Sequence, residues 1–115
     1  MIMAPVCPVM ELPNGGRVIR MVAGKSIGLF NVGGRIVAIQ NICPHELAPV
    51  CLGKVQGTTA PGAVGQWTYH REGEFLICPW HGWEFDLLTG ECLTDTRRLK
   101  HFETTVMDGW VHVLM

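Results

Sequence analysis

Hydrophobic residues recur along the chain in short runs that turn-forming residues interrupt. Fourteen glycines and seven prolines leave few windows long enough for a helix of ordinary length. Runs of β-branched and apolar residues have the length and composition of strands, and we expect strands at 17–22, 26–32 and 35–41. Gly33 and Gly34 suit a tight turn between the last two runs, because glycine adopts positive φ without strain. The pattern predicts an all-β protein.

The carboxyl-terminal part of the chain has the pattern of a β-hairpin. Strand-like runs at 102–107 and 110–115 flank Asp108 and Gly109, a pair that suits a type I′ turn. Residues 53–65 are rich in glycine, threonine and alanine without alternation, and they predict a surface loop inside one domain.

Two further segments give weaker signals. The runs 66–70 and 75–78 indicate another hairpin, with its turn at Glu72 and Gly73. A short helix within 93–101 is a further possibility, since this part of the chain lacks glycine and proline.

Length and charge narrow the possible functions. A chain of 115 residues with 48% hydrophobic and 17% charged residues predicts a single globular domain over 1–115. A formal net charge of −1 gives no reason to expect nucleic-acid binding or an anionic membrane surface. The start of the sequence lacks the basic and apolar regions of a signal peptide, and no run reaches the roughly 20 apolar residues of a membrane span. We expect a cytoplasmic protein.

The chain has five cysteines, an odd number that cannot pair completely. In a cytoplasmic protein, cysteines are more often metal ligands or buried thiols than members of a disulfide framework. The five are Cys7, Cys43, Cys51, Cys78 and Cys92.

Two of these cysteines are followed closely by a histidine. Cys43 and His45 are two positions apart, Cys78 and His81 are three apart, and a proline follows each cysteine. Each pair comes at the end of a strand-like run, so each would lie on a loop, and the two loops would share one pocket. A structural zinc ion bound by two cysteines and two histidines is one interpretation. Zinc sites, however, usually pair cysteine with cysteine and histidine with histidine, whereas mixed pairs suit a binuclear centre in which each loop supplies one ligand to each metal.

These mixed pairs and their surroundings resemble the Rieske iron–sulfur family, of the low-potential type associated with oxygenases. The resemblance covers most of the chain and includes the segments 48–53, 78–93 and 99–114. It implies a Rieske-like antiparallel β-sandwich with a cluster-binding subdomain of two β-hairpin loops, at approximately 42–92.

The resemblance also implies one [2Fe–2S] cluster with two cysteine and two histidine ligands. Cys43 and Cys78 would hold the inner iron, and His45 and His81 the outer one. Two ferric ions, two sulfides and two thiolates sum to zero charge, so the centre accepts an electron more readily than one with four thiolates. The reduction potential is then expected between roughly −150 and +300 mV.

The sequence departs from this pattern in two places. Residues 46–77 separate the ligand pairs by more than is usual, and Glu46 replaces a basic residue that many cytoplasmic relatives carry. High-potential relatives have a cysteine and two hydroxyl-bearing residues where this chain has Trp80, Trp83 and Phe85. Without those hydroxyl donors, we expect a potential near the low end of the range.

These observations predict an electron carrier and not an enzyme. The resemblance implies transfer from a flavin-dependent reductase to a terminal oxygenase, with no direct small-molecule substrate; the alternative is a small Rieske subunit of a larger oxidoreductase complex. An oxygenase needs a further mononuclear iron site for which this chain has no room, so we expect no catalytic residues. Cys7, Cys51 and Cys92 are expected to be packed thiols.

Overall fold

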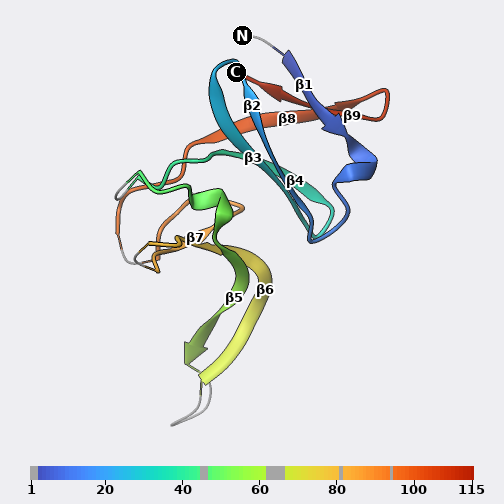
Figure 1. Cartoon of the computed structure of the whole chain (residues 1–115). Helices are drawn as coiled ribbons and strands as arrows, with labels where there is room; N and C mark the ends of the chain where they lie inside the picture. The colour runs from blue at the N-terminus through green and yellow to red at the C-terminus, as the bar shows by residue number, and fades with distance from the viewer. Residues whose placement is uncertain (1–2, 45–46, 62–66, 81, 94) are drawn as a thin grey trace.

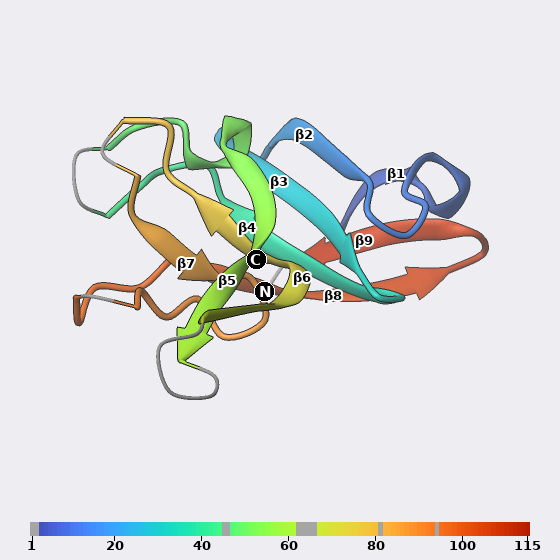
Figure 2. The same ribbon diagram turned by 90° about the horizontal axis from the view of Figure 1, so that it is seen from below.

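The computed structural model describes residues 3–44, 47–61, 67–80, 82–93 and 95–115, with backbone only for 58–61 and 67–72. All strand pairs are antiparallel, in a six-stranded sheet of order β1-β9-β8-β4-β3-β2 and a three-stranded sheet of order β5-β6-β7 (Figures 1 and 2). The elements are β1 (Met3–Pro8), η1 (Val9–Glu11), β2 (Arg17–Val22), β3 (Lys25–Val32), β4 (Arg35–Gln40), η2 (Val50–Leu52), β5 (Lys54–Pro61), β6 (Trp67–Ile77), β7 (Glu84–Asp86), β8 (His101–Met107) and β9 (Trp110–Leu114). This all-β fold confirms the predicted fold class.

The six-stranded sheet folds over so that its two halves enclose a core. β4 and β8 share only two residue pairs, Ala38 with Phe102 and Ile39 with His101, so the two halves diverge beyond this point. The enclosed residues are almost all aliphatic, and we call them the sheet core: Cys7, Leu12, Val18, Val22, Ile27, Leu29, Ala38, Val111 and Val113.

The strands predicted in both halves of this sheet are confirmed to within two residues at each end. Both tight turns have the expected backbone, with φ of 61° and 93° at Gly33 and Gly34 and of 52° and 78° at Asp108 and Gly109. Two successive residues of positive φ are the requirement of a type I′ turn.

The middle of the chain corrects the loop predicted at 53–65. Residues 54–61 form β5 and pair with β6, while residues 62–66 lie outside the described part. β5 and β6 project from the body as a ribbon (Figure 1). β7 pairs with β6 only at Phe75–Ile77, so the outer half of β6 pairs with β5 alone and the described ribbon has two strands there.

The hairpin predicted around Glu72 and Gly73 is also wrong, because β6 runs through both residues as one strand. The ladder register shifts there, from Gln56 opposite Phe75 to Thr58 opposite His70, and Gly73 has φ of 80°. Glycine here serves a bulge in a continuous strand and not a turn. The possible helix in 93–101 is absent from the described residues of that segment, which contain an isolated bridge from Arg98 to Glu91 and, at His101, the start of β8.

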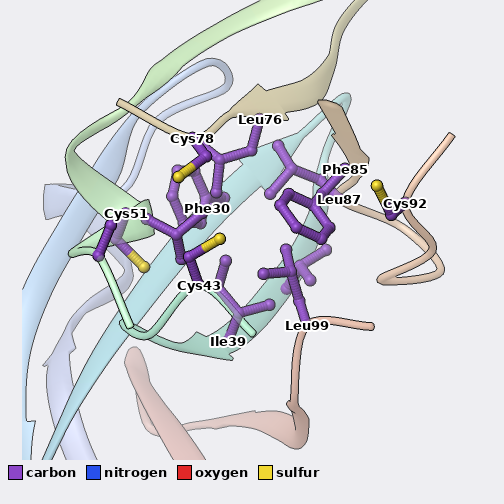
Figure 3. Packing of buried hydrophobic residues seen from close by; sticks show 13 residues of the cluster. Phe30, Ile39, Cys43, Cys51, Leu76, Cys78, Phe85, Leu87, Cys92 and Leu99 are labelled. Atoms are coloured by element: carbon purple, nitrogen blue, oxygen red, sulfur yellow. The ribbon is translucent and has the colours of Figure 1, made fainter. Parts of the chain in front are cut away.

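A second core joins the three-stranded sheet to the six-stranded one. We call it the loop core: Phe30, Val37, Ile39, Cys43, Ala48, Val50, Cys51, Leu76, Cys78, Phe85, Leu87, Cys92 and Leu99. Its members come from β3 and β4 on one side and from β6, β7 and the intervening loops on the other (Figure 3). Among the described residues, no helix is long and apolar enough to cross a membrane.

Candidate metal centre

The loop after β4 is closed by two backbone hydrogen bonds of Cys43. The Cys43 N–H donates to the Ala48 carbonyl oxygen at 2.8 Å, and the Cys43 carbonyl oxygen accepts from the Leu47 N–H at 2.8 Å. Leu47 has φ of 59°, a left-handed conformation that a residue other than glycine adopts at a cost of about 1–2 kcal/mol. The closed loop therefore fixes the direction in which the Cys43 side chain points away from the backbone.

The loop after β6 has the same construction around Cys78. The Cys78 N–H donates to the Trp83 carbonyl oxygen at 2.8 Å, and the Cys78 carbonyl oxygen accepts from the Gly82 N–H at 3.1 Å. Gly82, four residues after the cysteine like Leu47 in the first loop, has φ of 71°. In their described residues the two loops are thus matched in these hydrogen bonds and in the positive φ four residues after the cysteine, although at matching positions their sequences share only the cysteine and the proline.

The two cysteines lie together in the loop core. Cys43 is fully buried and Cys78 is 2% exposed, and Figure 3 shows both side chains with that of Cys51 at one end of this core, away from Cys92. All five cysteines lie in the described part of the chain, and none is in a disulfide. Thiolates are the ligands that iron–sulfur clusters use, so a pair of thiols from two matched loops fits the inner side of such a cluster.

The other two expected ligands, His45 and His81, lie outside the described residues, as does Glu46. Within the described part, no three side chains of metal-binding type come together. The three remaining histidines differ in environment: His101 is half-buried with Nε2 2.8 Å from the Leu87 carbonyl oxygen, His112 is half-buried on β9, and the side chain of His70 is not among those described.

The tryptophans of the second loop have different surroundings. Trp83 is half-buried against the loop core, its ring centroid 6.4 Å from that of Phe85, and the Arg97 guanidinium carbon lies 5.7 Å from its centroid. Trp80, by contrast, is 53% exposed. Trp83 and Phe85 therefore pack the loop against the core, whereas Trp80 exposes its aromatic ring to solvent.

Three apolar side chains in or next to the two loops are exposed to solvent. Leu47 is 74% exposed, Leu52 65% and Ile42 40%. Leu52 also borders a pocket of about 380 Å³ beside the second cysteine, lined by Leu52, Gly53, Lys54, Ile77, Cys78, Pro79 and Gly82. Exposed apolar residues beside a binding site are candidates for a contact surface.

Sequence reasoning missed the residues that hold the first loop on the six-stranded sheet. Arg17, on β2, donates from Nη1 to the carbonyl oxygens of Cys51 and Gly53 at 2.7 and 2.5 Å. Asn41 accepts from the Cys51 N–H through Oδ1 at 2.8 Å. No local pattern links Arg17 to a turn 34 residues away, so only the fold reveals it.

Burial determines the chemistry of Cys51. The side chain is fully buried, and burial raises the pKa of its thiol to about 12, although Arg17 and a backbone hydrogen bond from Gly28 act in the opposite direction. Burial also raises the pKa of the Cys7 thiol, with a smaller contribution from Glu11. Both are packed, protonated thiols at neutral pH, as expected.

Fold and loops together define a small antiparallel β-protein that presents two buried thiols from two matched loops, an arrangement suited to an iron–sulfur electron carrier. The family model for the Rieske [2Fe–2S] domain matches residues 3–104, and the chain belongs to this family. The protein is an electron-transfer protein of the Rieske ferredoxin type.

Relatives of known function cover most of the chain. The 3-phenylpropionate/cinnamic acid dioxygenase ferredoxin subunits of Shigella flexneri serotype 5b (strain 8401) and Escherichia coli (strain K12) are each 30% identical over 109 residues, which is 93% of this chain and 88% of theirs.

Solved structures show the same fold. The ferredoxin of carbazole 1,9a-dioxygenase from Nocardioides aromaticivorans IC177 superposes with a TM-score of 0.75 at 22% identity, over 98% of this chain and 97% of its own. A chain from the complex of reduced oxygenase and oxidized ferredoxin in carbazole 1,9a-dioxygenase gives 0.73 at 25% identity, over 97% and 92%.

Proposed function

We propose that the protein holds one [2Fe–2S] cluster, with Cys43 and Cys78 on the inner iron and His45 and His81 on the outer iron. The observation that supports this most strongly is the matched pair of loops, each closed around a buried cysteine by the same two backbone hydrogen bonds. We propose residues 42–92 as the cluster-binding subdomain of a single domain, 1–115.

When bound, the cluster supplies a one-electron redox centre. The residues of this chain hold it rigidly and shield its inner side: the closed loops fix Cys43 and Cys78, and the loop core excludes water behind them. The described part of the site has no arrangement for chemistry on a substrate, and we propose a carrier without catalytic residues.

We further propose that the electron passes from a flavin-dependent reductase to a terminal oxygenase, in the cytoplasm. The relatives named as ferredoxin subunits of a dioxygenase support this, as does the solved complex of an oxygenase with its ferredoxin. The exposed apolar side chains Leu47, Leu52 and Trp80 beside the loops provide the contact surface. Electron transfer favours docking close to the redox centre, and these residues lie next to its proposed ligands.

Metal and sulfide analysis with absorption and EPR spectroscopy tests the cluster. We expect about two irons and two labile sulfides per chain, and loss of both in Cys43→Ser and in Cys78→Ser. Cys7→Ser is the matched control, because Cys7 is equally buried but lies in the sheet core. One zinc per chain without sulfide would contradict the proposal.

Trp80 and Trp110 form a matched pair for testing the docking surface, because they are 53% and 43% exposed but only Trp80 lies on a cysteine loop. If Trp80 is the central aromatic residue of the contact, a hot-spot cost of about 2 kcal/mol means that Trp80→Ser should weaken partner affinity about thirtyfold, while Trp110→Ser should not. Equal effects of the two changes would place docking elsewhere. Constant co-purification with a catalytic chain would favour the alternative, a small subunit of a larger oxidoreductase.

A further inference from the structure

The short helical turn η2 lies between the two cysteine loops and touches both. It follows closely on Ala48, whose carbonyl oxygen accepts the hydrogen bond that closes the Cys43 loop. Gly53, at its other end, lies against the backbone of Ile77, and a Cβ atom at Gly53 would overlap the Ile77 carbonyl oxygen. Because Ile77 immediately precedes Cys78, the position of η2 affects both thiols.

Arg17 reaches η2 from the six-stranded sheet. Its Nη1 atom donates to the carbonyl oxygens of both Cys51 and Gly53, at 2.7 and 2.5 Å, and its guanidinium carbon lies 5.5 Å from the ring centroid of Phe30. Phe30 is itself a member of the loop core. One side chain thus contacts the turn and the core on which both loops rest.

The opposite side of η2 is held as well. The Cys51 N–H donates to Asn41 Oδ1 at 2.8 Å, and Asn41 Nδ2 donates to Ser26 Oγ at 3.2 Å. The Cys51 sulfur fills the space beside Gly28 on β3, where a Cβ atom would overlap it. Arg17 therefore completes a set of contacts that permits one position of the turn on the sheet.

We propose that Arg17 is a positioning residue that fixes the two cysteine loops relative to each other. The significance of this role for the redox centre rests on the proposed cluster ligands. The carbonyl groups at the end of a helical turn lack partners within the turn, and Cys51 and Gly53 are both buried, so their oxygens need a donor from elsewhere. A hydrogen bond from a charged donor is stronger than one between neutral groups, so the guanidinium is well suited to this role.

Arg17 is an exposed residue, so its replacement removes the hydrogen bonds to Cys51 and Gly53 without opening a cavity in either core. Arg20 provides a matched control on the same strand: it is also exposed and carries the same charge, but it donates only to the carbonyl oxygen of its neighbour Ile19, at 3.0 Å, and lies 3.7 Å from Glu11. Arg17→Met and Arg20→Met change the net charge equally, and Arg17→Lys keeps the charge and part of the donor capacity.

The experiment compares these three variants with the wild type by hydrogen exchange of peptides 43–53 and 77–83, by the visible circular dichroism of the cluster, and by its rate of loss to an iron chelator. For Arg17→Met we expect faster exchange in both peptides, unchanged exchange in 101–115, altered visible bands and cluster loss at least about tenfold faster. Arg17→Lys should recover part of each effect, and Arg20→Met should match the wild type.

The proposal would be overturned if Arg17→Met gave the same result as Arg20→Met in all three measurements. It would also be overturned if hydrogen exchange in Arg17→Met rose equally in 101–115, since that result means general destabilisation. If Arg17→Met does not fold, Arg17→Lys alone decides: selective exchange in the two loop peptides supports the proposal, and wild-type exchange contradicts it. A wild type without iron would refute the cluster ligands instead, and the exchange comparison on that protein would still test Arg17.

Discussion

Gly90, in the turn after β7, provides a quantitative test of how the second cysteine loop is attached to the sheet. Gly90 has φ of 82°, and a Cβ atom there would lie 2.7 Å from His101 Cε1, 2.8 Å from its Nδ1 and 2.9 Å from the Leu99 carbonyl oxygen. His101 in turn reaches the Leu87 carbonyl oxygen with Nε2 at 2.8 Å. Alanine at position 90 must displace this imidazole or the backbone.

The expected cost of Gly90→Ala has three parts. The left-handed conformation costs about 1–2 kcal/mol, partly offset by 0.4–1 kcal/mol from the lower entropy of the unfolded chain, in order-of-magnitude terms. Overpacking adds about 1–3 kcal/mol, and loss of the hydrogen bond from His101 adds about 1 kcal/mol. We expect a total of about 3–4 kcal/mol, whereas Gly24→Ala, at φ of 80° with no atom near its Cβ, should carry only the first part.

Thermal unfolding followed by far-ultraviolet circular dichroism measures the difference. At about 4 °C per kcal/mol for a chain of this size, Gly90→Ala should lower the unfolding midpoint by about 12–16 °C and Gly24→Ala by less than about 6 °C. In a His101→Ala background the additional effect of Gly90→Ala should shrink, because the imidazole that the new methyl group meets is gone. Equal shifts for the two glycine variants would refute the packing of His101 against Gly90.

Three further predictions follow from the contacts around the loops. Leu47→Gly should raise the free energy of unfolding by about 0.5–1 kcal/mol in chemical denaturation, since glycine removes the cost of φ at 59°; a loss of stability would show that the exposed leucine packs in the folded state. Between pH 8 and 10 the wild type should lose about 1.4 kcal/mol of stability relative to Cys51→Ser. The reason is that the Cys51 thiol ionises near its ordinary pKa of 9.0 in the unfolded chain but only near a pKa of about 12 in the folded protein. Parallel curves of unfolding free energy against pH for the two proteins would contradict this. Gly28→Ala should destabilise the wild type by about 1–3 kcal/mol and should destabilise a Cys51→Ala variant by less, as a double-mutant cycle would show. Strict additivity of the two changes would mean that Cys51 and Gly28 are not in contact.

The sequence predicted those parts of the fold in which local signals and burial agree. The predicted strands β2, β3, β4, β8 and β9 pack on a core and carry the β-branched and apolar runs by which strands are recognised, and Gly33 and Asp108 lie in two-residue turns whose chemistry is local. β1 carries no such run and was not predicted. β5 was missed because its glycine, threonine and alanine residues give no strand pattern, and the strand is defined by its pairing with β6 in a projecting ribbon. Gly73 misled the prediction because a glycine of positive φ serves a bulge as readily as a turn.

The cysteines of the site could be predicted from their spacing to the histidines. The residues that hold the cysteine loops in place could not, because they lie far from the loops in the sequence. A ligand pair is a local pattern, and the second loop even carries a glycine, Gly82, at its left-handed position; the first loop has Leu47 there and gives no such signal. The contacts of Arg17 with η2 and of His101 with Leu87 join residues that only the completed fold brings together. Each cysteine loop is closed by its own backbone, while Arg17 and His101 of the six-stranded sheet contact the segments that follow the two loops. The redox properties of a carrier built in this way therefore depend on the sheet beneath the loops as well as on the four residues proposed to hold the metal.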